Sequence, residues 1–328
     1  MKTIQRCICA LTLALSSALA THGALAQTPW PNKPLIVISP APGSSGDFVP
    51  RIIYEQVAKD LGTVLVMEFK QGLGGTLALE TVAHSAPDGY TIGIPSLGSL
   101  GIATTVQAKT LRYDPIKDFA GVARLVTTGN VIAVNKDLPV NTISELVAYA
   151  KARPGKLNFG AIAGFGTSYH LAWVLFAKQT GIDVVQIPFK AVTDATQATI
   201  GGDIQIIMSN TNTLLPLIQA GRIKALAVTT VVREASLPNV PTMQEAGLAG
   251  YEATSWFGAV VRAGTPQPIL DRLGAATLKA LQNPDVIAKL QKIGLDPYSQ
   301  NGKDFDAFYR AEIARWSQVV KDSGFKLE

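Results

Sequence analysis

Apolar residues recur along the chain in two alternating patterns. Short aliphatic runs bounded by glycine, proline and polar residues are typical of buried strands, whereas apolar residues spaced three or four apart are typical of amphipathic helices. The runs predict strands at residues 35–39, 64–68, 90–94, 131–135, 157–161, 184–187, 204–208 and 225–229. The helical spacing predicts helices between them at residues 47–61, 76–84, 144–153, 168–180, 192–200 and 214–220. This alternation predicts an α/β fold in which parallel sheets are covered by helices on both faces.

The C-terminal part has a different pattern, which predicts three consecutive helices at residues 266–282, 284–293 and 303–323. The first two begin at prolines, which are favoured in the first turn of a helix. Helices at the end of an α/β chain commonly brace a sheet formed earlier in the chain. No long linker interrupts the strand-rich part, so we expect the chain to cross between two domains through strand-like segments near residues 119–126 and 225–230.

Residues 1–26 have the pattern of a secretory signal peptide. Lys2 and Arg6 precede an apolar run over residues 8–19, and the small-residue pattern that ends at Ala26 predicts cleavage after it. An uncleaved membrane anchor is the alternative interpretation, but the run is short for a span of the bilayer.

Composition narrows the chemistry that remains after cleavage. The chain has 328 residues, 47% of them hydrophobic and 16% charged, which suits two domains with sizeable cores and excludes wholesale disorder. Both cysteines, Cys7 and Cys9, leave with the signal peptide, so no disulfide, thiolate metal site or cysteine nucleophile is expected. Two basic residues leave as well, which lowers the formal net charge of +5 by two, and the scattered remainder gives no indication of nucleic-acid binding. His84 and His170 lack carboxylates at a metal-binding spacing, so neither a metal nor a cofactor is expected.

Glycine, serine, threonine and asparagine gather in turns where a predicted strand leads into a predicted helix. The turns cover residues 40–47, 71–76, 164–170, 188–191 and 209–211. Such a turn presents free backbone N–H groups beside the positive end of a helix, where an anion can bind. The second turn lacks a complete dinucleotide-binding fingerprint, so a Rossmann cofactor site is not expected. For each turn, a plain structural connection is the competing interpretation.

Ser168 and His170 raise the question of a serine hydrolase. Residues two apart at the start of a helix point to different faces, so these two make a poor nucleophile and base. The chain also contains no G-x-S-x-G elbow. Lys190, in the fourth turn, could pair with a carboxylate, or it could simply lie in solvent. Polar turns without a catalytic set predict binding without reaction, so we expect a protein that is not an enzyme.

Short motifs form an ordered series along the predicted mature chain. They include Trp30-Pro31-Asn32-Lys33-Pro34, Ala86-Pro87-Asp88-Gly89-Tyr90-Thr91, Gly166-Thr167-Ser168, Leu237-Pro238-Asn239-Val240-Pro241-Thr242 and Ala263-Gly264-Thr265-Pro266. In this series the chain resembles the Bug-type receptors, the TctC-like extracytoplasmic solute-binding proteins of tripartite tricarboxylate transporters. The resemblance runs from about residue 30 to the C-terminus.

The resemblance implies a two-lobed periplasmic binding protein with a type II-like α/β fold. Each lobe is expected to be a mostly parallel sheet flanked by helices, with the ligand in a cleft between the lobes. Residues 27–125 and 227–328 are expected to form lobe I, and residues 126–226 to form lobe II. The implied function is that of a periplasmic monomer that captures a small carboxylate. It would deliver this ligand to the membrane permease of a tripartite tricarboxylate transporter or to a sensor domain.

Carried onto this chain residue by residue, the resemblance implies ligand contacts from both lobes. In such proteins the carboxylate is held largely by backbone groups, hydroxyls and bridging waters. The implied contacts from lobe I are Pro42, Gly43, Ser44, Ser45, Asp47, Gly74, Gly75, Thr76 and Ser96. Those from lobe II are Ala163, Gly166, Thr167, Ser168, His170, Lys190 and Asn210. Asp47 suits a helix cap better than a contact with an anion, because its own carboxylate would repel one.

The chain departs from the family pattern at three of these turns. The second turn reads Phe69-Lys70-Gln71-Gly72-Leu73-Gly74-Gly75-Thr76, where Asn-Arg-Pro-Gly-Ala-Gly-Gly-Asn is common. The first turn lacks the usual aromatic residue and gains a hydroxyl at Ser44, and Ser209 stands where an aspartate is usual. We therefore expect a less anionic cleft, suited to a second carboxylate or a flat aromatic acid. A receptor for an aromatic dicarboxylate such as terephthalate is the alternative to a general di- or tricarboxylate receptor. Outside this class, the alternatives are an exported serine hydrolase that uses Ser168 and a purely structural export protein.

Overall fold

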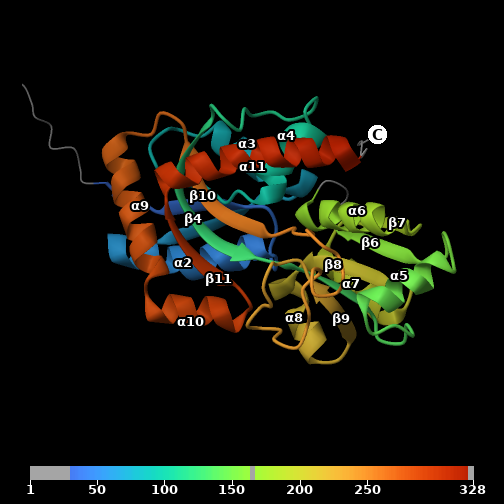
Figure 1. Ribbon diagram of the computed structural model, residues 1–328. Helices are drawn as coiled ribbons and strands as arrows, with labels where there is room; N and C mark the ends of the chain where they lie inside the picture. The colour runs from blue at the N-terminus through green and yellow to red at the C-terminus, as the bar shows by residue number, and fades with distance from the viewer. Residues whose placement is uncertain (1–29, 163–166, 324–328) are drawn as a thin grey trace, which may run out of the picture. The chain divides into compact units, whose positions relative to one another are not determined.

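The computed structural model describes residues 30–162 and 167–323 (Figure 1). The predicted signal peptide lies outside the described residues, and so do Ala163 and Gly166 among the expected ligand contacts. The strands and helices below belong to one compact unit that begins at Lys33. They form two β-sheets, each covered by helices.

The first sheet has six strands. They are β1 (Leu35–Ser39), β2 (Leu65–Phe69), β3 (Thr91–Gly93), β4 (Phe119–Thr128), β10 (Ser255–Arg262) and β11 (Asp296–Asn301). Their order across the sheet is β11-β4-β10-β3-β1-β2. β1 pairs in parallel with β2 and β3, whereas β10 runs antiparallel to both β3 and β4. β11 forms the outer edge, antiparallel to β4.

Helices cover both faces of this sheet, and we call the whole assembly lobe I (Figure 1). The helices are α2 (Ser45–Leu61), η1 (Leu73–Gly75), α3 (Thr76–Ala83), η2 (Leu97–Ile102), α4 (Ala103–Val106), α9 (Gln267–Leu281), α10 (Pro284–Lys292) and α11 (Gly302–Ser323). α2, α9 and α10 pack together on one face, and α3, α4 and α11 lie on the other. The three helices predicted at the C-terminal end are therefore present and brace the sheet, but they are not consecutive, because β11 lies between α10 and α11.

The second sheet has five strands, and with its helices we call it lobe II. The strands are β5 (Asn130–Asn135), β6 (Asn158–Ile162), β7 (Val185–Phe189), β8 (Ile206–Asn210) and β9 (Ile223–Val228). The helices are α5 (Ile143–Lys151), α6 (Ser168–Thr180), α7 (Val192–Gly201) and α8 (Thr211–Gln219). The strand order is β7-β6-β8-β5-β9.

The fully buried strand β5 shows how lobe II acquires a core on each face. Successive side chains of a strand point to opposite faces of its sheet. Ile132 and Val134 enter a core with side chains of α5 and α6, whereas Val131 and Ala133 enter a second core with side chains of α7 and α8. An uninterrupted apolar run is what a strand buried on both faces requires.

The expectation of mostly parallel sheets needs a correction, although the two-sheet α/β class is confirmed. Parallel pairing is confined to β1 with β2 and β3, and to β6 with β7 and β8. β5, which enters lobe II directly from β4, and the returning β9 pair antiparallel, so both sheets are mixed. An apolar run indicates that a strand is buried but carries no information about its direction.

α11 has 22 residues and is the longest of the described helices. Phe305, Tyr309, Trp316 and Val320 lie on its buried face, in a core that continues into lobe II. The spacing of these residues follows the helical repeat, with one side toward protein and the other toward solvent. Within the described part of the chain, no helix is long and apolar enough to cross a membrane.

A buried carboxylate ties α11 to the centre of the first sheet. Glu312 is 7% exposed, and its Oε2 accepts hydrogen bonds from the indole N–H groups of Trp256 and Trp316, each at 3.2 Å. The guanidinium of Arg124 lies nearby, 3.9 Å from the ring centre of Phe308 and close enough to interact with Glu312 electrostatically. A buried acceptor shared by two indoles is costly to remove, because both donors would lose their partner at once.

Replacing Glu312 with alanine should lower the free energy of unfolding by about 2–4 kcal/mol, because two buried N–H groups then lack an acceptor. Glu312→Gln keeps one acceptor oxygen and should cost roughly half as much. Urea denaturation of the two variants beside the parent protein measures both values. Equal losses for alanine and glutamine would contradict the assigned role of the carboxylate oxygen.

Candidate functional site

Helix starts from both lobes meet at one place in the fold. α2, α3 and η2 follow β1, β2 and β3, and α6 and α8 follow β6 and β8. Ligands of open α/β sheets bind beyond the carboxyl ends of the strands, where such turns gather. The contacts described next bring the turns of lobe I against those of lobe II.

The first turn of lobe I is held rigid by its own side chains. The backbone N–H of Gly43 donates to Asp47 Oδ2 (2.9 Å), and Asp47 also forms an ion pair with Arg51 at 2.7 Å. Gly43 has a φ of +69°, which favours glycine at this point of the turn. Ser44 Oγ donates to the carbonyl of Ala41, and α2 begins without a side-chain cap. Asp47 therefore shapes the turn, but it lies within the first turn of α2 and does not cap the helix as the sequence suggested, since Ser44 is at the N-cap position.

The second turn packs between the first turn and the start of η2. A Cβ added to Gly75 would lie 3.4 Å from Pro40 Cβ and 3.6 Å from Ser99 Cβ. Gly74 and Gly75 both have positive φ values, and Thr76 Oγ1 donates to the carbonyl of Leu73 (3.0 Å). α3 likewise begins without a side-chain cap. Tight packing with positive φ explains the paired glycines of this turn.

The start of η2 is capped within lobe I. Ser99 N donates to Ser96 Oγ (3.4 Å), and Ser96 N donates to Ser99 Oγ (3.0 Å). Tyr113 adds a hydrogen bond from its hydroxyl to the carbonyl of Ser99. Ser96, an expected ligand contact, thus serves as one half of a reciprocal cap.

The start of α6 meets lobe I at two glycines. A Cβ on Gly98 would lie 3.7 Å from the backbone N of Ser168, and one on Gly74 would lie 3.9 Å from Thr167 Cγ2. Thr167 caps α6, because its Oγ1 accepts from the backbone N–H of His170 (3.3 Å). Ser168 Oγ lies 3.4 Å from the hydroxyl of Ser255, at the start of β10.

The start of α8 meets the start of α2. Ser45 Oγ donates to Asn212 Oδ1 (2.9 Å) and lies 3.4 Å from Asn210 Oδ1. Asn210 is the N-cap of α8, but its side chain does not cap the helix. Its Nδ2 donates instead to Asn130 Oδ1 (3.0 Å). Ser45 and Asn210 are therefore close in space, although 165 residues separate them in sequence.

The helix starts contribute partial charges of the backbone at the place where the lobes touch. α2, α3, α6 and α8 each present a partial positive charge at the N-terminus, and three of the four lack a side-chain cap. The nearby cation Arg51 is paired with Asp47. An arrangement of this kind can bind an anion through unpaired N–H groups and hydroxyls.

Two expected ligand contacts, His170 and Lys190, have surroundings that differ from those of the other expected contacts. His170 is fully buried, and its Nε2 lies 2.7 Å from Gln186 Oε1. Burial lowers the pKa of His170 to about 4, and the hydrogen bond with Gln186 opposes this only in part. Lys190 follows β7 at the edge of the second sheet and is exposed. Ser168 lies beside Ser255, and His170 lies beside Gln186. Ser168 and His170 are therefore not arranged as a nucleophile with its base.

Asn130, Asn212 and Ser255 belong to the same place but were not predicted from the sequence. Asn212 stands one position beyond the fifth predicted turn, so a wider window around that turn would have included it. Asn130 and Ser255 lie in the segments where the chain passes between the sheets. No local pattern marks those two positions, because their partners are distant in sequence.

The crossing segments are joined by a small hydrogen-bond network. The backbone N–H of Asn130 donates to Thr229 Oγ1 (2.9 Å), and its Nδ2 donates to the carbonyl of Ala253 (2.7 Å). Thr229 Oγ1 donates to the same carbonyl. Through Asn210, this network is continuous with Ser45 in the cleft.

A buried acid lies beside the crossing segments. Glu234 is 8% exposed, and its Oε1 accepts from Thr211 Oγ1 (2.9 Å) and is also bonded by the backbone N–H of Gly129. A Cβ at Gly129 would collide with this carboxyl, so glycine is required there. Burial raises the pKa of Glu234 to about 7, reinforced by the charge of Asp296, while the hydrogen bond from Thr211 opposes it.

The raised pKa predicts a pH-dependent contribution to stability. The folded protein holds the Glu234 proton more tightly than the unfolded chain, whose ordinary value is 4.5. Stability from this group is therefore complete below about pH 4.5 and is lost as the pH rises towards 7. Relative to the parent protein, Glu234→Gln should gain about 2.5 kcal/mol of unfolding free energy between pH 5 and pH 8.

Urea denaturation of both proteins at the two pH values gives this difference directly. Glu245→Gln is a matched control, because Glu245 is exposed and its pKa is lowered by Arg233. A difference between parent and Glu234→Gln that does not change with pH would rule out a proton held by Glu234 in the folded state.

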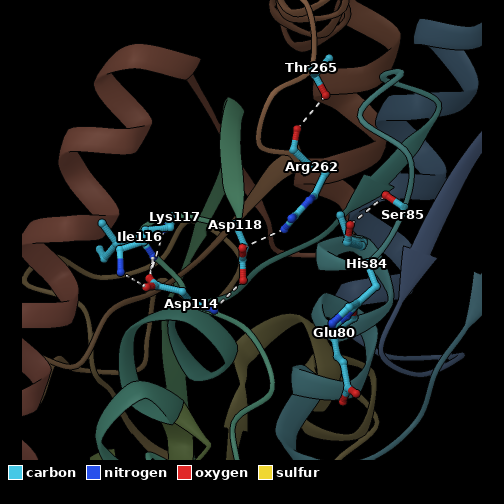
Figure 2. A network of polar contacts seen from close by, with 10 residues as sticks. Glu80, His84, Ser85, Asp114, Ile116, Lys117, Asp118, Arg262 and Thr265 are labelled. Carbon is cyan, nitrogen blue, oxygen red and sulfur yellow. Dashed lines mark hydrogen bonds and ion pairs between the residues drawn. The ribbon is translucent and has the colours of Figure 1, made fainter.

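A second polar network lies at the far end of β10 (Figure 2). Asp118 accepts from Arg262 Nη1 (2.8 Å) and from the backbone N–H of Asp114 (2.7 Å). Arg262 ends the strand that Ser255 begins, so about 23 Å of extended chain separates this network from the cleft. The network fixes the loop before β4. Among the described residues, no group of three or more His, Cys, Asp or Glu is placed to hold a metal ion.

Comparison with known proteins adds a family and several similar structures. Residues 49–325 match the family model described as the tripartite tricarboxylate transporter family receptor. The structure of the periplasmic binding protein BugD is similar, with a TM-score of 0.83 and 28% sequence identity over 91% of this chain and all of that one.

Two similar structures contain bound acids. R. palustris Rpa4515 with adipate has a TM-score of 0.86 and 33% identity, covering 90% of this chain and 98% of that one. MatC from Rhodopseudomonas palustris with bound malate has a TM-score of 0.82 and 32% identity, covering 89% of this chain and 100% of that one. Both identities are high enough for the likeness to extend beyond the general fold.

Proposed function

Because the chain belongs to the tripartite tricarboxylate transporter receptor family, we propose that it is a periplasmic receptor that captures a small carboxylate between its two lobes. The predicted signal peptide supports a periplasmic location. The proposed lobe boundaries are those expected from the resemblance, residues 27–125 with 227–328 and residues 126–226. The ligand would pass to the membrane permease of a tripartite tricarboxylate transporter or to a sensor domain.

The observation that carries this proposal is the meeting of four helix N-termini where the lobes touch. α2, α3 and α8 lack side-chain caps, so no side chain competes with an anion at the positive ends of these helices. Several hydroxyls lie beside them, including those of Ser45 and Ser168. Adipate and malate in the two similar structures support a di-acid as ligand.

The proposed ligand contacts are those implied by the family pattern, but some of them are better placed than others to contact a ligand. Ser44, Ser45, Gly74, Gly75, Thr76, Ser96, Thr167, Ser168 and Asn210 all belong to the turns that converge. Pro42 and Gly43 are exposed on the first turn, where a ligand could reach them. His170 is favoured as a support for the start of α6 rather than as a direct contact, because it packs against Gln186.

The mature protein, residues 27–328, should be stabilised by adipate, malate or an aromatic diacid such as terephthalate. At a concentration one hundred times the dissociation constant, binding adds about 2.7 kcal/mol to the stability of the folded state, enough to raise the melting temperature by several degrees. Adipamide, the uncharged diamide of adipate, should give no shift. A thermal-shift series followed by calorimetric titration measures both.

A variant that places a negative charge between the lobes provides a control in the protein, to complement the controls made with different ligands. Ser45→Asp puts a carboxylate between α2 and α8 and should abolish acid binding, whereas Ser144→Asp, on the exposed start of α5, should leave it unchanged. Ester or amide hydrolysis that disappears in Ser168→Ala would favour the serine-hydrolase alternative. Absence of any shift with a folded protein across the acids would refute a carboxylate receptor.

A further inference from the structure

Asn212 carries an unsatisfied donor at the place where the lobes touch. The residue is 6% exposed and lies in the first turn of α8. Its Oδ1 accepts from Ser45 Oγ of lobe I (2.9 Å), whereas its Nδ2 is buried and has no hydrogen-bond partner among residues 30–162 and 167–323. A buried donor without an acceptor is costly and uncommon in folded proteins. An unpaired N–H₂ group beside the proposed ligand site is therefore a candidate donor to an oxygen of the ligand.

Neighbouring groups limit how the amide of Asn212 can be satisfied from within the protein. The carbonyl of Ala253 can only accept, so Asn130 presents Nδ2 to it and Oδ1 to Asn210 Nδ2. Asn210 Oδ1 is then turned towards the hydroxyl of Ser45. In the orientation that the structure gives the Asn212 amide, that hydroxyl has one proton for two carboxamide oxygens, and among the described residues nothing accepts from Asn212 Nδ2.

We propose that Asn212 is a ligand-binding and specificity-determining residue, whose Nδ2 donates to an oxygen at one end of the bound acid. This inference rests on the proposed function. The amide carries no net charge, so it would select an oxygen acceptor over an apolar group by hydrogen bonding. A site built to donate to a ligand oxygen rejects the analogue that lacks it, because the buried donor is then left unpaired.

The position of Asn212 indicates which part of the site holds the end of the ligand that it would bind. Pro40 packs between Gly46 at the start of α2 and Gly75 at the start of α3, so the two helix starts form separate parts of the cleft. Asn212 belongs to the part formed by α2 and α8, through its bond to Ser45. An acid with oxygens at both ends could use both parts, whereas a monoacid would leave one of them without an acceptor.

Matched acids and variants test this assignment. Adipate and hexanoate have the same chain length, and so do malate and 2-hydroxybutyrate, but the second acid of each pair lacks one carboxylate. Asn212→Leu should weaken binding of the better diacid by about 10- to 100-fold and that of its monoacid by less than about threefold. Asn212→Asp keeps the acceptor for Ser45 but replaces the donor with a negative charge, so it should weaken the diacid at least as much.

Two further readouts separate ligand recognition from a structural role. Ser144→Ala, on the exposed start of α5 and outside the site, should preserve both affinities and their ratio. Without ligand, Asn212→Leu should melt at the same temperature as the parent protein or higher, because an unpaired polar group is replaced by an apolar one. A structural asparagine would instead lower the melting temperature and weaken both acids equally.

The outcomes distinguish this inference from the proposed function. Loss of diacid preference in Asn212→Leu, with an unchanged melting temperature of the free protein, supports it. Diacid affinity equal to that of the parent protein, or equal losses for both acids of a pair, overturns the role of Asn212 and leaves the carboxylate receptor standing. A parent protein that binds none of the four acids, nor an aromatic diacid such as terephthalate, overturns both.

Discussion

The first turn of an α-helix leaves backbone N–H groups without partners inside the helix, and the fold of this protein gathers several such turns in one cleft. Each turn is short and follows a buried strand, so the two sheets determine where the helix starts lie. Gly74 and Gly75 adopt positive φ values that favour glycine, and Gly74, Gly75 and Gly98 lie beside Thr167, Pro40 and Ser168 respectively. The glycines thus lie at or beside the starts of helices, among which α2, α3 and α8 lack side-chain caps. The glycines and these helix starts come together at a place where the charges of Asp47 and Arg51 are paired with each other.

Small polar groups make the hydrogen bonds between the helix starts of the two lobes, while apolar side chains of α11 and α6 pack in a core shared by both lobes. Ser45 with Asn212 and Ser168 with Ser255 would have to separate if the lobes moved apart, and each involves neutral hydroxyl or amide groups. Neutral pairs are readily exchanged for water, so contact between the lobes does not depend on breaking an ion pair. A ligand that bridges the same turns would add its own hydrogen bonds to the contact. Differential binding of this kind is what shifts a protein between open and closed states.

Much of the fold can be predicted from the sequence, but the candidate site can be predicted only in part. Apolar periodicity predicts the β–α alternation, and small polar residues after strands indicate Ser45, Thr167 and Asn210. The prediction omits β10, which follows a long segment of turns rather than a helix, and β11, whose sequence Asp-Pro-Tyr-Ser-Gln-Asn is polar and forms a strand only because β4 lies beside it. Strand direction and the pairing of Ser45 with Asn212, 167 residues away, depend on tertiary packing that local patterns do not encode.

Recognition by neutral donors has a consequence for how specificity can vary on this scaffold. The helix starts supply attraction for any small anion, because partial charges on backbone N–H groups do not depend on which side chains follow. Discrimination must therefore come from side chains that are buried beside those starts and can be left unpaired by the wrong ligand. Asn212 meets that description, whereas Asp47 and Arg51 satisfy each other within the first turn. On such a scaffold, a change of one buried amide alters which acid is preferred while the backbone field that attracts acids stays the same.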